Sequence, residues 1–288
     1  MKNILITGYN GLIGKVLAEQ LKQDSSLGIY GIVRSQSALE NLITLDLAQN
    51  WSADRLPEKM DVIVHLAQSE KFRDFPAGAM DVFNVNTYST LKLLEYGRRA
   101  GVKKFIYASS GGIYGNHENA FNEEEPISGG KGLGFYLSSK FCSELLIEAY
   151  TPLLDIVILR FFFVYGKNQR AHMLIPRLIN NIKNNVPITL DGQEGIKINP
   201  VYVDDAASAI VQSMKLEGSH KINVGGVEIL SIRQICDIIG EKLSTIPSYT
   251  IRDIPPKNLI GDIKKMNHLL LKPAISFEKG IEKMLYEH

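Results

Sequence analysis

The chain has 288 residues, 45% of them hydrophobic, which suits one large α/β domain, alone or with a small satellite. A formal net charge of +1 excludes a global field that would attract nucleic acid or an anionic membrane. The first apolar run is too short for a secretion signal, no stretch approaches the roughly 18 apolar residues of a membrane span, and the histidines and two cysteines show no metal-ligand spacing. We therefore expect a soluble, cytoplasmic protein without a metal site, a nucleic-acid partner or a membrane partner.

Short apolar runs alternate with helical patterns through the first two-thirds of the chain. Apolar runs without polar alternation are typical of strands buried on both faces of a parallel sheet. The predicted strands are Asn3–Thr7, Gly28–Val33, Leu42–Leu45, Asp61–Ala67, Lys104–Ser109 and Asp155–Phe162, and the predicted helices are Gly11–Gln23, Phe83–Ala100 and Phe135–Tyr150. This alternation implies right-handed crossovers and an α/β fold with a doubly wound, Rossmann-type parallel sheet.

The rhythm changes after Gly166, where strands become shorter and no longer alternate regularly with helices. Beyond that point the patterns predict helices over Met173–Asn184, from the N-cap Ser231 to about Leu243, and over Ser276–Tyr286, with short strands at Ile188–Leu190, Val201–Val203 and Lys221–Val224. No low-complexity linker precedes this region. We therefore expect a smaller C-terminal lobe packed on the first domain.

A glycine-rich turn, Gly8-Tyr9-Asn10-Gly11-Leu12-Ile13-Gly14, joins the first predicted strand to the first predicted helix. Glycine permits a tight turn and close approach of the backbone to a pyrophosphate, and the helix N-terminus offers N–H groups and a positive dipole end. The spacing is GxxGxxG, but the flanking strand and helix favour a phosphate loop over an ordinary turn. The expected cofactor contacts are Gly8, Asn10, Gly11, Leu12, Ile13 and Gly14.

The end of the second predicted strand bears on the choice of dinucleotide. An acid there would bind the ribose 2′-hydroxyl of NAD, whereas an arginine accommodates the 2′-phosphate of NADP. Here Val33 is followed by Arg34-Ser35-Gln36-Ser37, with no acid in reach. We predict NADP as the preferred cofactor and NAD as the alternative; a solvated surface charge is the other interpretation of Arg34.

Two further strand ends fit the predicted cofactor cleft. Asp46 and Leu47 follow the third strand, and Asp46 could accept from the adenine amino group or could cap a helix. Leu66, Ala67 and Gln68 follow the fourth strand, at the carboxyl edge where dinucleotides lie.

These motifs divide the chain into two parts. We predict a dinucleotide-binding domain over residues 1–166, to which residues 198–226 return. Residues 167–197 and 227–288 are predicted to form the substrate-binding lobe.

Tyr136 and Lys140 stand four residues apart, so they share one face of a predicted helix. A free tyrosine has a pKa near 10, and a nearby ammonium favours the phenolate, which makes the tyrosine a usable general acid–base at neutral pH. Such a pair is common by chance, but Ser109-Ser110-Gly111-Gly112 ends the fifth strand at the same sheet edge. There the Ser110 hydroxyl can hold a substrate oxygen, and the glycines leave room for a sugar-sized ring. The predicted catalytic residues are Ser110, Tyr136 and Lys140.

Several motifs, spread over nearly the whole chain, are typical of one protein family. They are the glycine loop, Asn86, Ser109-Ser110, Tyr136-x-x-x-Lys140, Leu159-Arg160-Phe161-Phe162, Val201-Tyr202-Val203-Asp204-Asp205 and Ile222-Asn223-Val224-Gly225-Gly226. Together they resemble the extended short-chain dehydrogenases/reductases, and within them the NAD-dependent epimerase/dehydratase group, which acts mainly on nucleotide sugars.

The resemblance implies a role for each matched residue. Ser110 would orient the substrate, Tyr136 would be the acid–base, and Lys140 would bind the nicotinamide ribose and tune Tyr136. Ser109 and Phe162 would line the nicotinamide, and Asn86 would support the cofactor site. A homodimer through the helices Phe83–Ala100 and Phe135–Tyr150 is also implied.

The chain departs from the family pattern at three places. Gly111-Gly112 replaces the acidic pair of sugar 4,6-dehydratases, which argues against dehydration. Phe163 and Ile198 stand where an asparagine and an arginine usually help to hold the nucleotide diphosphate. Without them a diphosphate needs other donors, and the nearest candidates are Lys167, Arg170, His172 and Arg252.

We therefore predict an NAD(P)-dependent 4-epimerase or 4-ketosugar reductase of a nucleotide sugar. The expected substrate contacts are Ser110, Gly111, Phe163, Arg170 and His172. The alternatives are a reductase of a smaller carbonyl compound and a non-catalytic NADP-binding sensor or scaffold, because a binding fold does not fix function.

Overall fold

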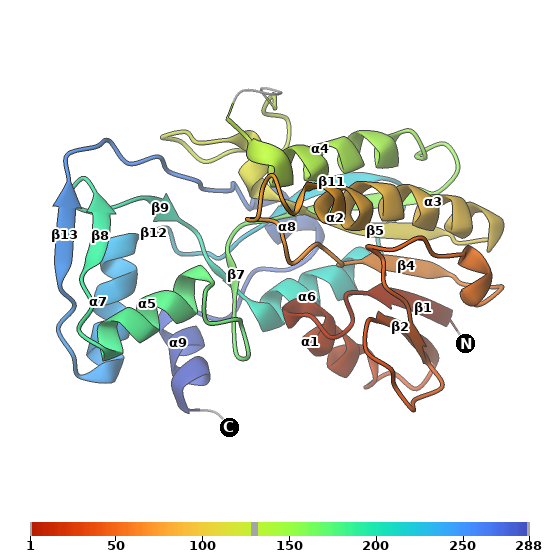
Figure 1. The fold of residues 1–288 in the computed structure, drawn as a ribbon, viewed down its shortest axis with the longest axis horizontal. Coiled ribbons are helices and arrows are strands. Elements are labelled where there is room, and N and C mark those ends of the chain that lie inside the picture. Colours follow the sequence, from red (N-terminus) through yellow and green to blue (C-terminus); the bar gives the residue numbers. More distant parts are fainter. Residues whose placement is uncertain (1, 128–131, 287–288) are drawn as a thin grey trace.

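A seven-stranded parallel sheet forms the centre of the protein, whose computed structural model describes residues 2–127 and 132–286 (Figure 1). The spatial order is β3-β2-β1-β4-β5-β6-β11. The strands are β1 (Lys2–Thr7), β2 (Leu27–Val33), β3 (Leu42–Thr44), β4 (Val62–His65), β5 (Lys104–Ser110), β6 (Asp155–Phe161) and β11 (His220–Val224). The order reverses between β1 and β4, which creates the crevice where doubly wound sheets bind ligands. The predicted Rossmann-type α/β fold is confirmed.

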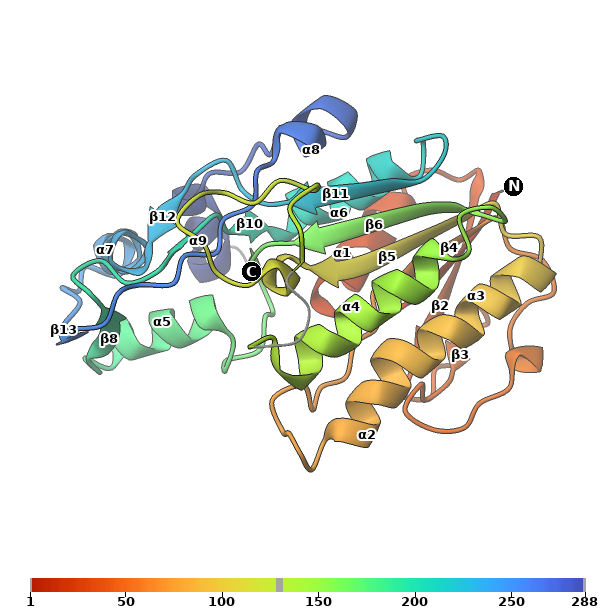
Figure 2. The same ribbon diagram turned by 90° about the horizontal axis from the view of Figure 1, so that it is seen from above.

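Helices cover both faces of the sheet (Figure 2). On one face α1 (Leu12–Leu21) packs against α6 (Val203–Ser213). The other face carries α4 (Gly134–Glu148) and, beside it, a continuous helical segment. That segment consists of α2 (Ala79–Val82), a π-helical turn (Phe83–Tyr88) and α3 (Ser89–Arg99), and two short 3₁₀ helices lie at Ala53–Arg55 and Gly111–Tyr114.

The hydrophobic core is divided by the sheet, because successive side chains of a strand point to opposite faces. Ile4 and Ile6 of β1 pack with Leu17 of α1, whereas Leu5 packs with Leu93 of α3. The apolar runs of the sequence are thus buried on both sides, which is why they lack polar alternation.

The remaining elements form a smaller region with a core of its own, seen at the left of Figure 1. Its strand pairs are β7 (Val164–Tyr165) with β10 (Val201–Tyr202), β8 (Ile188–Asp191) with β13 (Tyr249–Arg252), and β9 (Lys197–Ile198) with β12 (Leu230–Ser231). Its helices are α5 (Leu174–Lys183), α7 (Ile232–Leu243) and α9 (Phe277–Tyr286), while α8 (Lys264–Leu269) lies beside β11. Ser231 caps α7 as predicted, and its Oγ accepts from the Gln234 N–H at 3.1 Å.

The structure differs from the sequence prediction at α6. The pattern predicts a strand through Val203, but this residue instead begins a helix. Asp204 and Asp205 favour a helix start through the dipole, and the following Ala206 and Ala207 allow close packing against α1. No helix among the described residues is long and apolar enough to cross a membrane.

Candidate active site at the carboxyl edge of the sheet

The loop between β1 and α1 can be built only from glycine at its key positions. Gly8 has φ +68°, and a Cβ there would lie 2.9 Å from the Ala67 nitrogen. A Cβ at Gly14 would lie 2.2 Å from the Gly8 carbonyl oxygen, whereas the Gly11 N–H donates to that oxygen at 2.8 Å. No side chain caps α1, so its first N–H groups remain available to an anion. This geometry fits the pyrophosphate of a dinucleotide.

A cavity of about 300 Å³ adjoins this loop. Its lining includes Asn10, Gly11 and Leu12 together with Lys15 and Lys167. It covers only one end of the predicted cofactor cleft, because none of its lining residues comes from β4 or β5. Ile13, the remaining loop residue, packs into the hydrophobic core.

The end of β4 is fixed against β1 at the switch point. The Ala67 N–H donates to Thr7 Oγ1 at 3.1 Å, and the Leu66 N–H donates to the Thr7 carbonyl at 3.3 Å. Gln68 follows, and its Oε1 accepts from the Tyr136 hydroxyl at 2.8 Å. The structure thus brings together the predicted cofactor residue Gln68 and the predicted acid–base.

Tyr136 and Lys140 lie on α4, as their spacing predicts, but the electrostatics differ from expectation. The Lys140 ammonium is buried, donates to the Ala108 carbonyl at 2.8 Å and lies 5.0 Å from the Tyr107 ring centroid. Burial lowers the pKa of Lys140 to about 7, and Glu144 opposes this shift. Burial also raises the pKa of Tyr136 above its usual value, whereas the sequence argument expects a lowered one. In the ligand-free protein the Tyr136 phenol is therefore protonated at neutral pH.

Lys140→Met should change how stability depends on pH. Because burial lowers the pKa of Lys140 from 10.5 to about 7, the unfolded chain binds more protons than the folded one between these values. The free energy of unfolding of the wild type should therefore rise between pH 7 and pH 9, by about 1–2 kcal/mol from this group. Chemical denaturation across this range measures the slope, and Lys140→Met should lose that contribution. Equal slopes in the two proteins would contradict a buried lysine with a lowered pKa.

The two serines that end β5 have different surroundings. Ser110 Oγ accepts from the Gly112 N–H at 3.2 Å and caps the 3₁₀ helix Gly111–Tyr114. Ser109 is buried, and its hydroxyl has no hydrogen-bond partner among the described residues. Buried polar groups are normally satisfied, so this hydroxyl at the predicted nicotinamide position fits a polar group of a bound cofactor.

The space expected at Gly111 for a sugar ring is filled by another side chain. A Cβ at Gly111 would lie 2.4 Å from the Phe162 ring. That ring is 1% exposed and packs with Tyr114 and Phe121. Phe162 is therefore a core side chain, not the predicted cleft-lining one, and the glycine is required for its packing.

Asn86 supports the site from the π-helical turn. Its Oδ1 accepts from the Ser69 N–H at 2.9 Å, and its Nδ2 donates to Ser139 Oγ at 2.9 Å. It thereby ties the segment after β4 to α4, next to the turn that carries Tyr136. A π-helical turn at a functional site is a recurring arrangement.

The predicted residues at the adenosine end of the cleft require two corrections. Asp46 does not cap a helix, because its Oδ1 accepts from the Ala48 N–H in a turn; Leu47 is buried. No acid near Arg34 is expected from the residues after β2, yet Glu70, which follows β4, pairs with its guanidinium. The same carboxylate pairs with Arg170. Contacts between segments so far apart in the chain cannot be predicted from the residues next to either one.

The cations proposed as diphosphate donors have separate surroundings. Lys167 lines the cavity beside the glycine loop, Arg170 binds Glu70, and Arg252 pairs with Asp191 on the outer β8–β13 pair. The His172 side chain is exposed and its carbonyl accepts from Arg73 Nη1 at 3.3 Å.

Both departures from the diphosphate pattern are apolar positions of the smaller lobe's core. Ile198 is fully buried, and Phe163, with φ 47°, packs against the same cluster. Among the described residues, no group of three or more His, Cys, Asp and Glu side chains could hold a metal ion.

Known proteins resemble this chain over nearly all of its length. The chain is 30% identical to an uncharacterized UDP-glucose epimerase of Bacillus subtilis over 311 aligned positions, which cover 96% of this chain and 95% of the relative. It is 32% identical to the UDP-glucuronate 4-epimerase of Thermodesulfobacterium geofontis, covering 97% and 94% of the two chains. The solved structure of a Bacillus cereus UDP-glucuronic acid 4-epimerase, in complex with UDP-glucuronic acid and NAD, matches with a TM-score of 0.86, 26% identity and coverage of 98% and 97%.

The model of the NAD dependent epimerase/dehydratase family matches residues 4–225, a range that spans the glycine loop, Ser110, Tyr136 and Lys140. The chain therefore belongs to the NAD-dependent epimerase/dehydratase family and is an enzyme of the extended short-chain dehydrogenase/reductase type.

Proposed function

We propose that this protein is a 4-epimerase of a nucleotide sugar. The main observation behind this proposal is that the ends of β1, β4 and β5 lie at the same sheet edge as the start of α4. The glycine loop follows β1, Gln68 follows β4 and bonds Tyr136 of α4, and Ser109 and Ser110 end β5. The similarity to UDP-glucuronate 4-epimerases supports this reading.

Each catalytic residue has a task that its position suits. In its phenolate form, which Lys140 would stabilise in the complex with substrate and dinucleotide, Tyr136 would take the proton of the substrate 4-hydroxyl and return it after the second hydride transfer. Ser110 would hold the same oxygen, and Lys140 would lower the cost of charge on the Tyr136 oxygen. A bound dinucleotide supplies a hydride acceptor that can return the hydride to the opposite face of the sugar.

The smaller lobe, predicted at residues 167–197 and 227–288 and sharing its core with Phe163, Tyr165 and Ile198, would bind the nucleotide portion. Because Phe163 and Ile198 offer no polar side chain, the diphosphate would need donors such as Lys167 and backbone N–H groups. A buried phosphate without partners is costly, so these donors are required for a nucleotide-sugar substrate.

A substrate panel tests the proposal. The purified protein with NAD or NADP is incubated with UDP-glucuronate, UDP-glucose, dTDP-glucose, GDP-mannose and simple ketones, and products are separated by anion-exchange chromatography and identified by NMR. We expect interconversion of the 4-epimers of one nucleotide sugar without net change in NAD(P)H absorbance. Failure to convert any nucleotide sugar, with reduction of a small ketone, would overturn the assignment.

A 4-ketosugar reductase is the second candidate. Arg34 favours it, because a guanidinium at the end of β2 suits NADPH, the usual donor for net reduction. An Escherichia coli dTDP-4-dehydro-6-deoxyglucose reductase is 26% identical over 98% of this chain. Stoichiometric loss of NADPH absorbance with a 4-keto nucleotide sugar distinguishes this activity from epimerisation.

We also propose NADP(H) as the preferred cofactor, on the same argument from Arg34. The solved relative holds NAD. Calorimetric titration of the protein with NADPH and with NADH gives the two dissociation constants. Tighter binding of NADH would contradict the preference for NADP(H).

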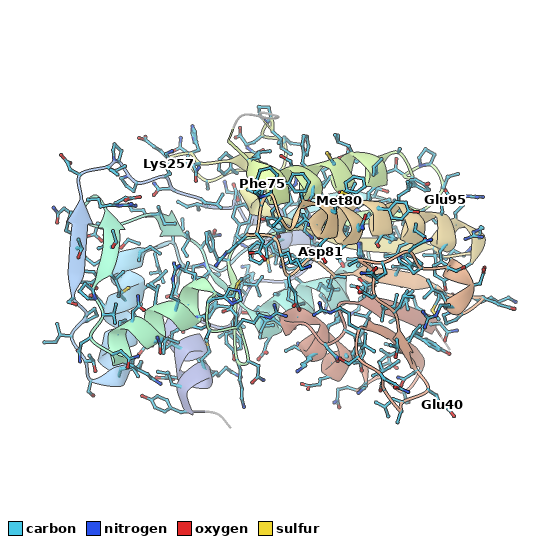
Figure 3. The ribbon with its side chains drawn as sticks, viewed as in Figure 1. Glu40, Phe75, Met80, Asp81, Glu95 and Lys257 are labelled. Carbon is cyan, nitrogen blue, oxygen red and sulfur yellow. The ribbon has the colours of Figure 1, made fainter. Side chains whose placement is uncertain are left out.

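We further propose a homodimer through the helical face of the sheet. The helical segment and α4 lie side by side with no described element over them (Figure 2). Their exposed apolar side chains are Met80, Phe83, Tyr88, Phe135 and Leu145. Figure 3 shows Met80 and Phe75 at this surface. The Phe75 ring stacks on the Phe135 ring, with 5.3 Å between the ring centroids. Light scattering should give twice the chain mass.

A further inference from the structure

The Glu70 carboxylate lies between two arginines that come from different parts of the chain. Arg34 follows β2, and Arg170 follows β7 in the direction of α5. The Nη2 atoms of both arginines donate to the same oxygen, Glu70 Oε1. The two hydrogen bonds lower the pKa of the Glu70 carboxyl, which is therefore ionised at neutral pH. One oxygen with two guanidinium donors is an arrangement that a phosphate oxygen could equally occupy.

The segment that carries Glu70 is held at both ends. Ser69 donates its N–H to Asn86 Oδ1 at 2.9 Å and its hydroxyl to Asp81. Further along, Arg73 Nη1 donates to the His172 carbonyl at 3.3 Å. The Ser69 contacts thus hold the backbone directly before Glu70 in place.

Arg34 stands where doubly wound folds read the adenosine ribose of a dinucleotide, directly after β2. Because Arg170 shares an oxygen with Arg34, it lies at this same end of the cleft. Arg170 is predicted from the sequence to contact the substrate, whereas in the structure it binds the same carboxylate as Arg34.

We propose that Glu70 is an internal competitor of the 2′-phosphate for Arg34 and Arg170, and thereby weakens the preference for NADP that Arg34 alone would give. With Glu70 in place, the neutral 2′-hydroxyl of NAD can bind without displacing any charge. A 2′-phosphate must displace the carboxylate and then lies close to it, which is a like-charge contact. With a neutral side chain at position 70, the two arginines would balance a dianionic phosphate. The inference rests on the proposed function only in that the chain binds a nicotinamide dinucleotide.

Glu70→Gln tests this directly in binding, without any turnover. The probes are adenosine 2′,5′-bisphosphate and 5′-AMP, which differ only in the 2′-phosphate, followed by NADPH and NADH. Because the three side chains are 62%, 38% and 55% exposed, each ion pair contributes modestly, so we expect a fall of about five- to tenfold in the Kd of the bisphosphate and NADPH. The Kd values of 5′-AMP and NADH should change less than about twofold.

Two further variants complete the experiment. Glu58→Gln makes the same charge change in the loop before β4, at the opposite end of that strand, and should alter neither Kd. Arg170→Gln should raise the Kd of the bisphosphate severalfold and leave that of 5′-AMP unchanged.

Isothermal titration at constant ionic strength gives all of these values. Equal effects of Glu70→Gln on both fragments, or no effect on either, would overturn the inference while leaving the proposed function intact. A wild-type protein that binds neither dinucleotide would contradict the proposed function and this inference with it.

Discussion

Tyr136→Phe should lower kcat by at least about a hundredfold, because it deletes only the hydroxyl that transfers the proton. The structure places this hydroxyl at the carboxyl edge of the sheet, 2.8 Å from Gln68 Oε1. Loss of one hydrogen bond should cost about 1 kcal/mol of stability, so the variant should fold and bind the dinucleotide. Steady-state turnover of the sugar identified by the substrate panel measures the effect, and calorimetry measures cofactor affinity.

Tyr150→Phe provides the matched control for this experiment. Tyr150 lies just after the other end of α4, where its hydroxyl donates to Glu95 Oε1, away from the sheet edge. Removal of this hydroxyl should leave kcat within about twofold, because it takes no part in proton transfer. If the Tyr136→Phe variant turned over at the wild-type rate, Tyr136 would be excluded as the acid–base.

The elements that the sequence predicts well are those defined by local spacing. Within the glycine loop, Gly8 has a positive φ, and a Cβ at Gly11 or Gly14 would crowd the Gly8 carbonyl oxygen. Tyr136 and Lys140 lie one turn apart on α4. Their positions along the chain therefore determine their positions in space. The alternation of strands with helices predicts a doubly wound parallel sheet in the same way, because connections between parallel strands are right-handed as a rule.

The features that sequence reasoning misses depend on distant segments. The Phe162 ring fills the space above Gly111, so a glycine expected to admit substrate instead admits a core side chain. Glu70 reaches Arg34 from another strand end, so the acid absent after β2 is supplied after β4. Burial also reverses the expected shift in the pKa of Tyr136, because desolvation disfavours the charged phenolate.

A buried ion pair between α4 and the sheet is another feature that neighbouring residues in the sequence do not predict. Arg160 on β6 and Glu144 on α4 are 2% and 0% exposed, and Arg160 Nη2 donates to Glu144 Oε2 at 2.7 Å. Arg160 Nη1 also donates to the Tyr114 hydroxyl at 2.6 Å, and this hydroxyl donates to Asn223 Oδ1 at 2.9 Å. The network joins α4 to β6, β11 and the 3₁₀ helix after Ser110. It therefore fixes the helix that carries Tyr136 and Lys140 against the sheet.

Glu144→Gln should lower the free energy of unfolding by about 3–5 kcal/mol, because it leaves the Arg160 charge buried without its counter-ion. Glu148→Gln makes the same change one turn later on α4, where the carboxylate pairs with Lys221 and both side chains are more than one-third exposed. An exposed pair contributes about 0–1 kcal/mol, so this control should differ little from the wild type. Urea denaturation at pH 7 followed by circular dichroism measures both variants. If Glu144→Gln were no more destabilising than Glu148→Gln, the ion pair would not be what holds α4 in place.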